Sequence, residues 1–198
     1  MKTPYPQYQV LDKWDSPSFD DKTRHVLAAR LRVIPRRRFF TEREWQLLDA
    51  IAARVVPQPD RSEPVPITPW IDENLFHGRG EGFRHDNMPP VRQAWRAGLA
   101  AIDAEARRRH GRGFTELDDA ARDAVLHAIQ RNEVDPALWP GVPAQRFFID
   151  ILAKAVAAVY YAHPAAWSEI GFGGPASPRG YVRLGFNQRD AWEAKEMP

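Results

Sequence analysis

Apolar residues recur every three or four positions through the middle of the chain, which is the spacing that places them on one face of an α-helix. The clearest example begins at Thr41, where residues 41–44 (TERE) match the capping box of a helix start. The apolar stripe that follows consists of Trp45, Leu48, Ile51, Ala52 and Val55. Pro57 and Pro59 then interrupt the pattern, so the sequence predicts a helix between residues 41 and 57.

The same spacing predicts further helices over residues 20–34, 68–78, 90–110, 118–130 and 144–162. Thr68 and Asp118 are placed to act as N-caps, and Gly111 is placed to end the helix before it. Asp118 and Asp119 are therefore interpreted as a cap and its neighbour at the positive end of the helix dipole, in preference to a pair of catalytic acids.

The last of these helices is apolar around most of its circumference, which is typical of a helix enclosed by others. Strand-like alternation is nearly absent from the chain. We therefore expect an all-α fold, a single domain of about five or six helices around the helix at 144–162. Trp45 and Trp95 lie on helical stripes, and we expect both in the core.

The two ends of the chain have a different composition, in which proline or glycine separates aromatic residues. This pattern divides the chain into an extended N-terminal arm (1–19), a helical domain (20–163) and an irregular C-terminal arm (164–198). Aromatic residues without a helical stripe of their own are candidates for a partner interface. They are Tyr5, Tyr8, Trp14, Trp167, Phe172, Tyr181, Phe186 and Trp192. The alternative, that the arms cover the chain's own core, stays open.

Composition removes several kinds of chemistry. The chain has no cysteine, which excludes disulfides, thiolate-held clusters and a cysteine nucleophile. The best histidine pair for a metal is His77 with His85, and a solvated loop is the preferred interpretation. The glycines at 78–82 and 171–174 lack the strand that a dinucleotide-binding turn requires. We identify no catalytic, cofactor-binding or metal-binding residues, and the residues give no membrane span.

Arginine clusters at 36–38 and 107–109 suggest an alternative function, a helical adaptor that binds nucleic acid or another protein. The formal net charge of +2 is too small to favour nucleic acid, which we do not expect as a partner. Residues 36–40 (RRRFF) also resemble a twin-arginine export box, but charged residues follow where an apolar segment should be. We therefore expect a cytoplasmic protein, with co-export beside a partner to the periplasm as the alternative.

Several short segments, in consistent order, resemble the gluconate 2-dehydrogenase subunit 3 family. They are FFTERE (39–44), LLDA (47–50), RVVP (54–57), RAGLAAID (96–103), GRGFTEL (111–117), FF (147–148) and GYVRLGF (180–186). The resemblance spans residues 39–186, and its individual motifs are short. Many members carry a twin-arginine signal, from which this sequence departs.

The resemblance implies a small, non-catalytic and chaperone-like subunit that stabilises a larger partner. The expected partner is an FAD-containing oxidoreductase of the glucose-methanol-choline type, which acts on CH–OH groups of sugars or glycosides. The two chains would form a heterodimer, often with a cytochrome subunit that accepts electrons. On this interpretation FAD belongs to the partner, and this chain holds no cofactor and catalyses nothing alone.

Overall fold

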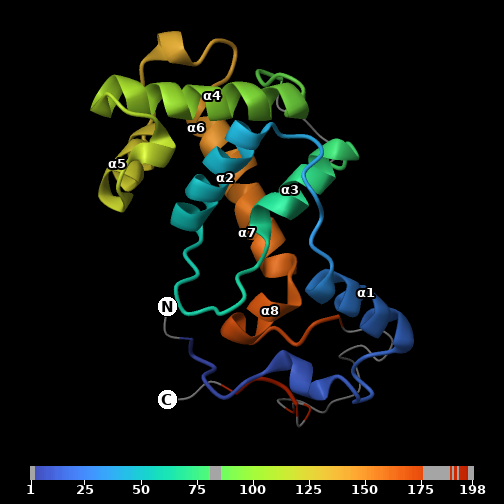
Figure 1. The fold of residues 1–198 in the computed structure, drawn as a ribbon. Helices are drawn as coiled ribbons and strands as arrows, with labels where there is room; N and C mark the ends of the chain where they lie inside the picture. Colours follow the sequence, from blue (N-terminus) through green and yellow to red (C-terminus); the bar gives the residue numbers. More distant parts are fainter. Residues whose placement is uncertain (1–2, 81–85, 176–187, 189, 191, 196–198) are drawn as a thin grey trace. The chain divides into compact units, whose positions relative to one another are not determined.

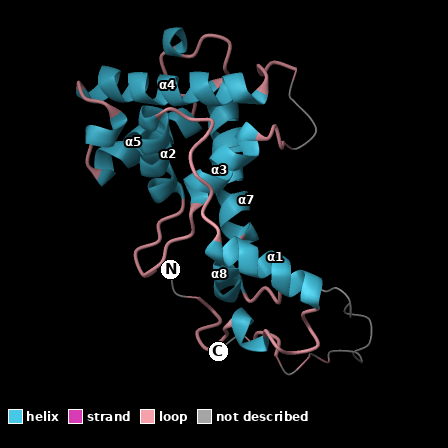
Figure 2. Cartoon of the chain, turned by 45° about the vertical axis from the view of Figure 1, so that its right-hand side comes forward, coloured by secondary structure: helices cyan, strands magenta, loops and turns pink. Residues whose placement is uncertain are grey.

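The computed structural model of the chain describes residues 3–80, 86–175, 188, 190 and 192–195 (Figure 1). Within these ranges every regular element is a helix, as Figure 2 shows, and the expected all-α class is confirmed. The chain forms two compact units. The middle unit comprises residues 35–159, and the terminal unit combines residues 1–34 with 160–198.

The middle unit contains helices at the positions that the hydrophobic pattern predicts. They are α2 (Glu42–Val55), α3 (Ile67–Phe76), α4 (Val91–His110), α5 (Asp119–Gln130), α6 (Ala144–Arg146) and the first residues of α7 (Lys154–Ala162). The longest helix, α4, runs across α2 and packs against α5 (Figure 1). This arrangement brings the apolar faces of α2, α4 and α5 together.

Local capping explains most of the helix boundaries. The capping box of α2 is complete, since the Thr41 hydroxyl accepts from the backbone N–H of Glu44 and the Glu44 carboxylate accepts from the backbone N–H of Thr41. Asp118 caps α5 as predicted, and Gly111 ends α4 in the left-handed conformation. The predicted cap of α3 is wrong, because that helix begins at Ile67 and Thr68 lies buried inside its first turn.

The core of the middle unit is formed by apolar residues from the predicted helical stripes. Its fully buried side chains include Leu48, Ile51, Leu99, Ile102, Ile129 and Phe147. Trp95 is buried as expected, and its ring meets those of Phe40 and Phe147 edge-on, with centroids 5.9 Å apart in each pair. Trp45 is only partly buried, so the expectation that it is a core residue is wrong.

The helical segment at 144–162 has two different faces. Its central part, Phe147–Ala153, is wound as a π-helix between α6 and α7. Phe147, Leu152 and Val156 are fully buried, whereas the side chain of Ile149 is 42% exposed and Asp150 is exposed. The segment therefore buries one face only, in contrast to the expected enclosure on most sides.

The terminal unit is built from both ends of the chain. Its helices are α1 (Asp21–Arg32), α8 (Pro164–Trp167) and the 3-10 turns Val10–Lys13 and Ser168–Ile170. Val10, Phe19, Leu27 and Trp167 form its core, with Tyr8, Leu11 and Trp14 packed against it. The sequence pattern assigned residues 21–32 to the helical domain, whereas the contacts group α1 with the two arms.

Candidate partner interface

The structure describes six of the eight aromatic residues that the sequence proposes as a partner interface, and all six belong to the terminal unit. Trp167 is buried, with 3% of its surface exposed, and its indole N–H donates to the carbonyl of Tyr161 at 2.7 Å. Phe172 packs edge-on against Trp167 at 5.2 Å yet remains 42% exposed. Trp167 thus contributes to the unit's own core, while Phe172 also faces solvent.

The N-terminal aromatic residues are partly buried against the other end of the chain. Gly171 has a positive φ of 65°, and a Cβ atom there would lie 2.7 Å from the ring of Tyr5. Trp14 meets Phe19 edge-on at 6.1 Å, and Tyr8 packs on the core. Because the arms pack on each other, the alternative in which they cover their own core accounts for much of their aromatic content.

Trp192 is partly buried, whereas Tyr181 and Phe186 lie outside the described residues. The interface that the sequence proposes stays a prediction for all eight residues. Among those described, Phe172 is the most exposed residue, at 42%, whereas the other five are buried or partly buried.

Lys13 joins the two arms through its side chain. Its ammonium group donates to the carbonyl of Gly173 and lies 4.9 Å from the centre of the Phe19 ring. Burial lowers the pKa of Lys13, and the carboxylates of Glu193 and Asp190 oppose that shift. The Lys13 ammonium group thus contacts the backbone at residue 173 and interacts electrostatically with the carboxylates of residues 190 and 193.

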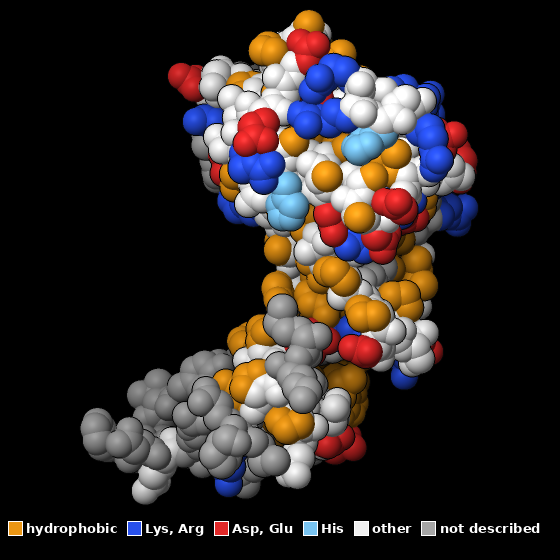
Figure 3. All heavy atoms as spheres, turned by 90° about the vertical axis from the view of Figure 1, so that its left-hand side faces the viewer, with side chains coloured by type: hydrophobic (Ala, Val, Ile, Leu, Met, Phe, Trp, Pro, Cys, Tyr) orange, Lys and Arg blue, Asp and Glu red, His pale blue; other side chains and the backbone are white. Residues whose placement is uncertain are grey.

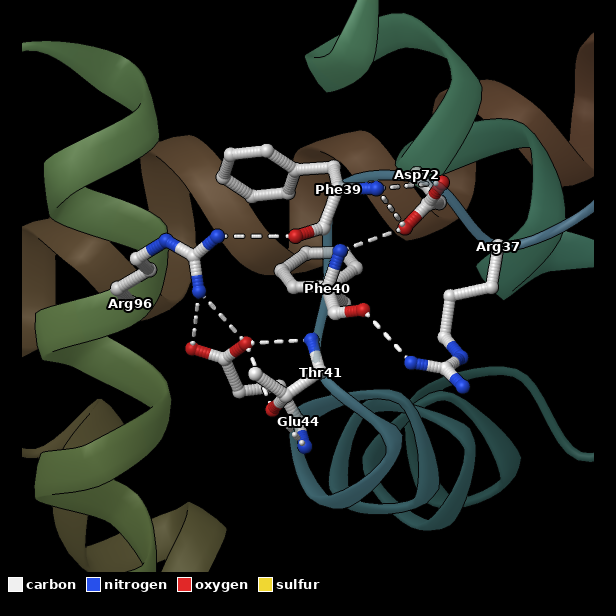
Figure 4. Close-up of polar contacts among 7 residues, drawn as sticks. All are labelled: Arg37, Phe39, Phe40, Thr41, Glu44, Asp72 and Arg96. Atoms are coloured by element: carbon white, nitrogen blue, oxygen red, sulfur yellow. Dashed lines mark hydrogen bonds and ion pairs between the residues drawn. The ribbon is translucent and has the colours of Figure 1, made fainter.

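In the middle unit, buried Asp72 on α3 holds the irregular segment that leads into α2 (Figure 4). Its carboxylate accepts from the backbone N–H groups of Arg38 at 2.7 Å, Phe39 at 3.1 Å and Phe40 at 2.8 Å. Three backbone donors that have no helix or sheet to satisfy them are thereby paired. This carboxylate fixes the position from which α2 starts.

Arg96 on α4 completes the same network from the opposite side (Figure 4). Its guanidinium donates to the Glu44 carboxylate at 2.8 Å and to the carbonyl of Phe39 at 2.9 Å, and stacks 4.5 Å from the Phe39 ring. Since Glu44 is also the capping-box carboxylate of α2, one arginine connects α4 to the cap of α2. The network therefore connects α2, α3 and α4 through hydrogen bonds.

Two further carboxylates, those of Glu105 and Asp103, form hydrogen bonds near the C-terminal end of α4. Glu105 is fully buried and accepts from the backbone N–H of Asp135 at 2.7 Å and from the guanidinium groups of Arg108 and Arg109. Burial by itself raises the pKa of Glu105, but these hydrogen bonds outweigh it, and the pKa lies below its ordinary value.

Asp103, two residues before Glu105 on α4, holds the loop after that helix. It accepts from the backbone N–H of Phe114 at 2.9 Å and pairs with Arg43 and Arg107. Its pKa is also lowered, because these donors outweigh the opposing effect of burial. A Cβ atom at Gly113 would lie 2.9 Å from its carboxylate, so the loop approaches α4 closely there.

The two arginine clusters are largely engaged inside the chain. Arg37 and Arg38 pair with Glu42 and Glu73, and all three arginines at 107–109 pair with carboxylates of α4. Figure 3 shows Asp and Glu side chains beside Lys and Arg on the face it draws. Such pairing reduces the charge that these clusters offer to a phosphate backbone.

The structure describes only one residue of the histidine pair considered for a metal site. His77 lies 3.0 Å from the Glu73 carboxylate, and His85 is outside the described residues. In the part of the chain that the structure describes, no three His, Cys, Asp or Glu side chains gather as metal ligands would.

In a comparison with known protein families, the model of gluconate 2-dehydrogenase subunit 3 matches residues 42–174. The chain belongs to this family. No curated protein and no solved structure matches it. Membership makes the chain a subunit of a multi-subunit dehydrogenase, and among the described helices none is long and apolar enough to cross a membrane.

The match to the gluconate 2-dehydrogenase subunit 3 family covers most residues of the hydrogen-bond networks described above. It includes α2 with Glu44, Asp72, Arg96 and the carboxylates of α4, and it extends through Trp167 to Gly174. Sequence reasoning quoted several of these positions as family motifs but missed Asp72. No local signal distinguished it, because Glu73 and Asn74 follow Asp72 directly in the sequence.

Proposed function

We propose that the chain is a non-catalytic accessory subunit that binds and stabilises a large, FAD-containing dehydrogenase subunit of the glucose-methanol-choline type. The observation that carries this proposal is the family match over residues 42–174. The partner would oxidise a CH–OH group of a sugar or polyol at its flavin. In this account, the present chain supplies a folded surface and the partner supplies the chemistry.

The roles of the buried acidic residues support an accessory function. Asp72 and Glu105 are both fully buried, and their oxygen atoms accept from backbone N–H groups, to which Glu105 adds two guanidinium groups. A general acid or base must reach a substrate proton and exchange its own proton during turnover. Carboxylates fixed in this way stabilise the fold instead of taking part in proton transfer.

The terminal unit supports the binding part of the proposal. Phe172 presents an accessible aromatic ring on a firmly packed base, because its other side rests on Trp167. Aromatic side chains that are held rigidly and remain partly exposed are typical centres of protein interfaces. Phe172 is therefore the first contact residue to test.

The test is to purify the tagged chain from its own cells and to separate the captured subunits from it. We expect the visible absorbance of flavin to follow a large co-purified subunit, while the isolated chain is colourless. Stoichiometric flavin on the isolated chain, or capture of no dehydrogenase subunit, would reject the proposal.

A further inference from the structure

Helix α1 of the terminal unit has an exposed face that is both apolar and cationic. Its inner face carries Leu27, which is 1% exposed in the unit's core. Val26 and Val33 are 47% and 51% exposed and lie seven residues apart, which places them on the same side of the helix. Val33 is the C-cap of α1, and its N–H donates to the carbonyl of Ala29.

Cationic residues flank these two valines. Lys22 and Arg30 lie four residues before and after Val26, so they share its side of the helix, and both are exposed. In the sequence no acidic residue occurs between Asp21 and Glu42. The exposed face of α1 therefore combines an apolar centre with positive charge and has no carboxylate of its own beyond its first residue.

Two further apolar residues extend this face. The Arg30 guanidinium donates to the carbonyl of Ala162 at 3.2 Å, and the ring of His163 lies 3.0 Å from the carbonyl of Arg30. These contacts place the end of α7 beside α1. Tyr161, the neighbour of Ala162, is 44% exposed, and Ile34 at the end of α1 is 69% exposed. We name Lys22, Val26, Arg30, Val33, Ile34 and Tyr161 the α1 surface.

We propose that the α1 surface docks on an acidic, partly apolar face of another subunit of the dehydrogenase. The proposal rests on the proposed function, because it needs the complex that family membership implies. Scattered single apolar residues on a surface need no explanation, but a contiguous set rimmed by charge marks an interaction site. From Lys22 onward this face carries positive charge and no carboxylate of its own helix, which favours an acidic partner that both steers association and fixes orientation.

The residue types favour a protein partner over a lipid surface. Interfacial membrane helices expose bulky Trp, Phe and Leu to the acyl chains, whereas the helical part of the α1 surface exposes two valines. Arginine and tyrosine, as at Arg30 and Tyr161, are enriched at the centres of protein interfaces. The α1 surface is also separate in sequence from Phe172, so the two can be tested independently.

The experiment uses the full chain, tagged and expressed in its own cells, with the dehydrogenase subunits that the unaltered chain captures as the probe. The test variant is Val26→Glu with Val33→Glu. The matched control is Val91→Glu with Ile149→Glu, whose side chains in the middle unit are similarly exposed, at 41% and 42%. We expect the test variant to capture at least about tenfold less dehydrogenase and the control to remain within about twofold of the unaltered chain.

Melting temperatures of both purified variants show whether each substitution leaves the fold intact. Lys22→Glu provides a second test variant at an exposed position. We expect Lys22→Glu to weaken capture several-fold, with a dependence on ionic strength. Undiminished capture by both test variants would overturn the proposal, and so would an equal loss in the control.

Vesicles of phosphatidylglycerol and phosphatidylcholine test the lipid alternative. Binding of the unaltered chain to them that Val26→Glu with Val33→Glu abolishes, while capture of the dehydrogenase persists, would assign the α1 surface to a membrane. Failure of the unaltered chain to capture any dehydrogenase would instead reject the proposed function itself, and the α1 partner with it. The two failures are therefore distinguishable.

Discussion

Gly98 on α4 faces the ring of Phe147 so closely that a Cβ atom at position 98 would overlap the ring carbons. The ring has little room to move, since two tryptophan rings pack against it. The ring centroid of Trp95 lies 5.9 Å away in an edge-on arrangement, and that of Trp139 lies 6.3 Å away. A glycine at position 98 thus allows α4 to approach the π-helical segment. This close approach sets the spacing at the centre of the middle unit.

Replacing Gly98 by alanine should destabilise the middle unit by about 1 to 3 kcal/mol, because the added methyl group overpacks a rigid aromatic core. Thermal unfolding measured by circular dichroism checks this. Gly80→Ala is the matched control, since a Cβ atom at Gly80 meets nothing within 4 Å. Equal melting temperatures for the two variants would show that α4 and Phe147 are not in close contact.

Asp72→Ala should destabilise the chain by about 3 to 5 kcal/mol, because it leaves three backbone N–H groups unpaired beside a buried position. Asp72→Asn keeps the shape and one oxygen acceptor, so a smaller loss is expected. Chemical denaturation gives both values. Asp60→Ala, at an exposed turn residue, should change little, and a similar loss there would contradict the assigned role of Asp72.

Stability should fall in acid because the pKa values of Glu105 and Asp103 are lowered in the folded state. A carboxyl group whose folded pKa lies below its unfolded value stabilises the protein above the unfolded pKa. That contribution is lost as the pH falls below about 4.5 toward the folded pKa. Denaturation across this range should show a flatter acid dependence in Glu105→Gln than in the unaltered chain.

Glu105→Gln should also be less stable at neutral pH, by about 1 to 3 kcal/mol, since it weakens the charge-assisted hydrogen bonds from two partly exposed guanidinium groups. Glu63→Gln, at an exposed residue, serves as the control for both measurements. An acid dependence that is unchanged in Glu105→Gln would show that this carboxylate does not govern acid stability.

Substitutions at Trp167 and Phe172 should have different effects, the first on folding and the second on binding, although their rings pack against each other. Trp167→Ala should destabilise the terminal unit by about 3 to 5 kcal/mol, because it empties the centre of a small core. Phe172→Ala should leave the melting temperature nearly unchanged and weaken capture of the dehydrogenase by about 2 kcal/mol. Unfolding and quantitative pull-down of both variants check this, and unimpaired capture by Phe172→Ala would remove that residue from the interface.

The sequence predicts those features of the fold that depend on neighbouring residues. The capping box at Thr41 and Glu44 and the cap at Asp118 lie within one helical turn, so local hydrogen bonding determines them. The start of α3 differs from the prediction because Thr68 matches a cap locally, whereas the helix with buried Ile67 and Ile71 begins two residues earlier, with Pro66 at the N-cap position. Tertiary burial overrode the local signal there.

Features that join distant residues were not predictable. Asp72 pairs with backbone groups 32 to 34 positions away, which no spacing rule reveals. Likewise Val10 and Phe19 share a core with Trp167, although the sequence suggests two separate arms. The aromatic composition predicts that these ends need a surface to bury against, and in the described residues the two ends supply much of that surface for each other.

The central claim is that this chain stabilises a catalytic partner and is not itself the catalyst. The most direct measurement is the thermal inactivation of the large dehydrogenase subunit, purified alone and reassembled with this chain, with the chain alone assayed in parallel. The account predicts a longer half-life of activity in the reassembled complex, a dependence on the concentration of this chain, and no activity from the chain alone. An unchanged half-life at saturating concentrations of this chain, or turnover by the chain in isolation, would contradict it.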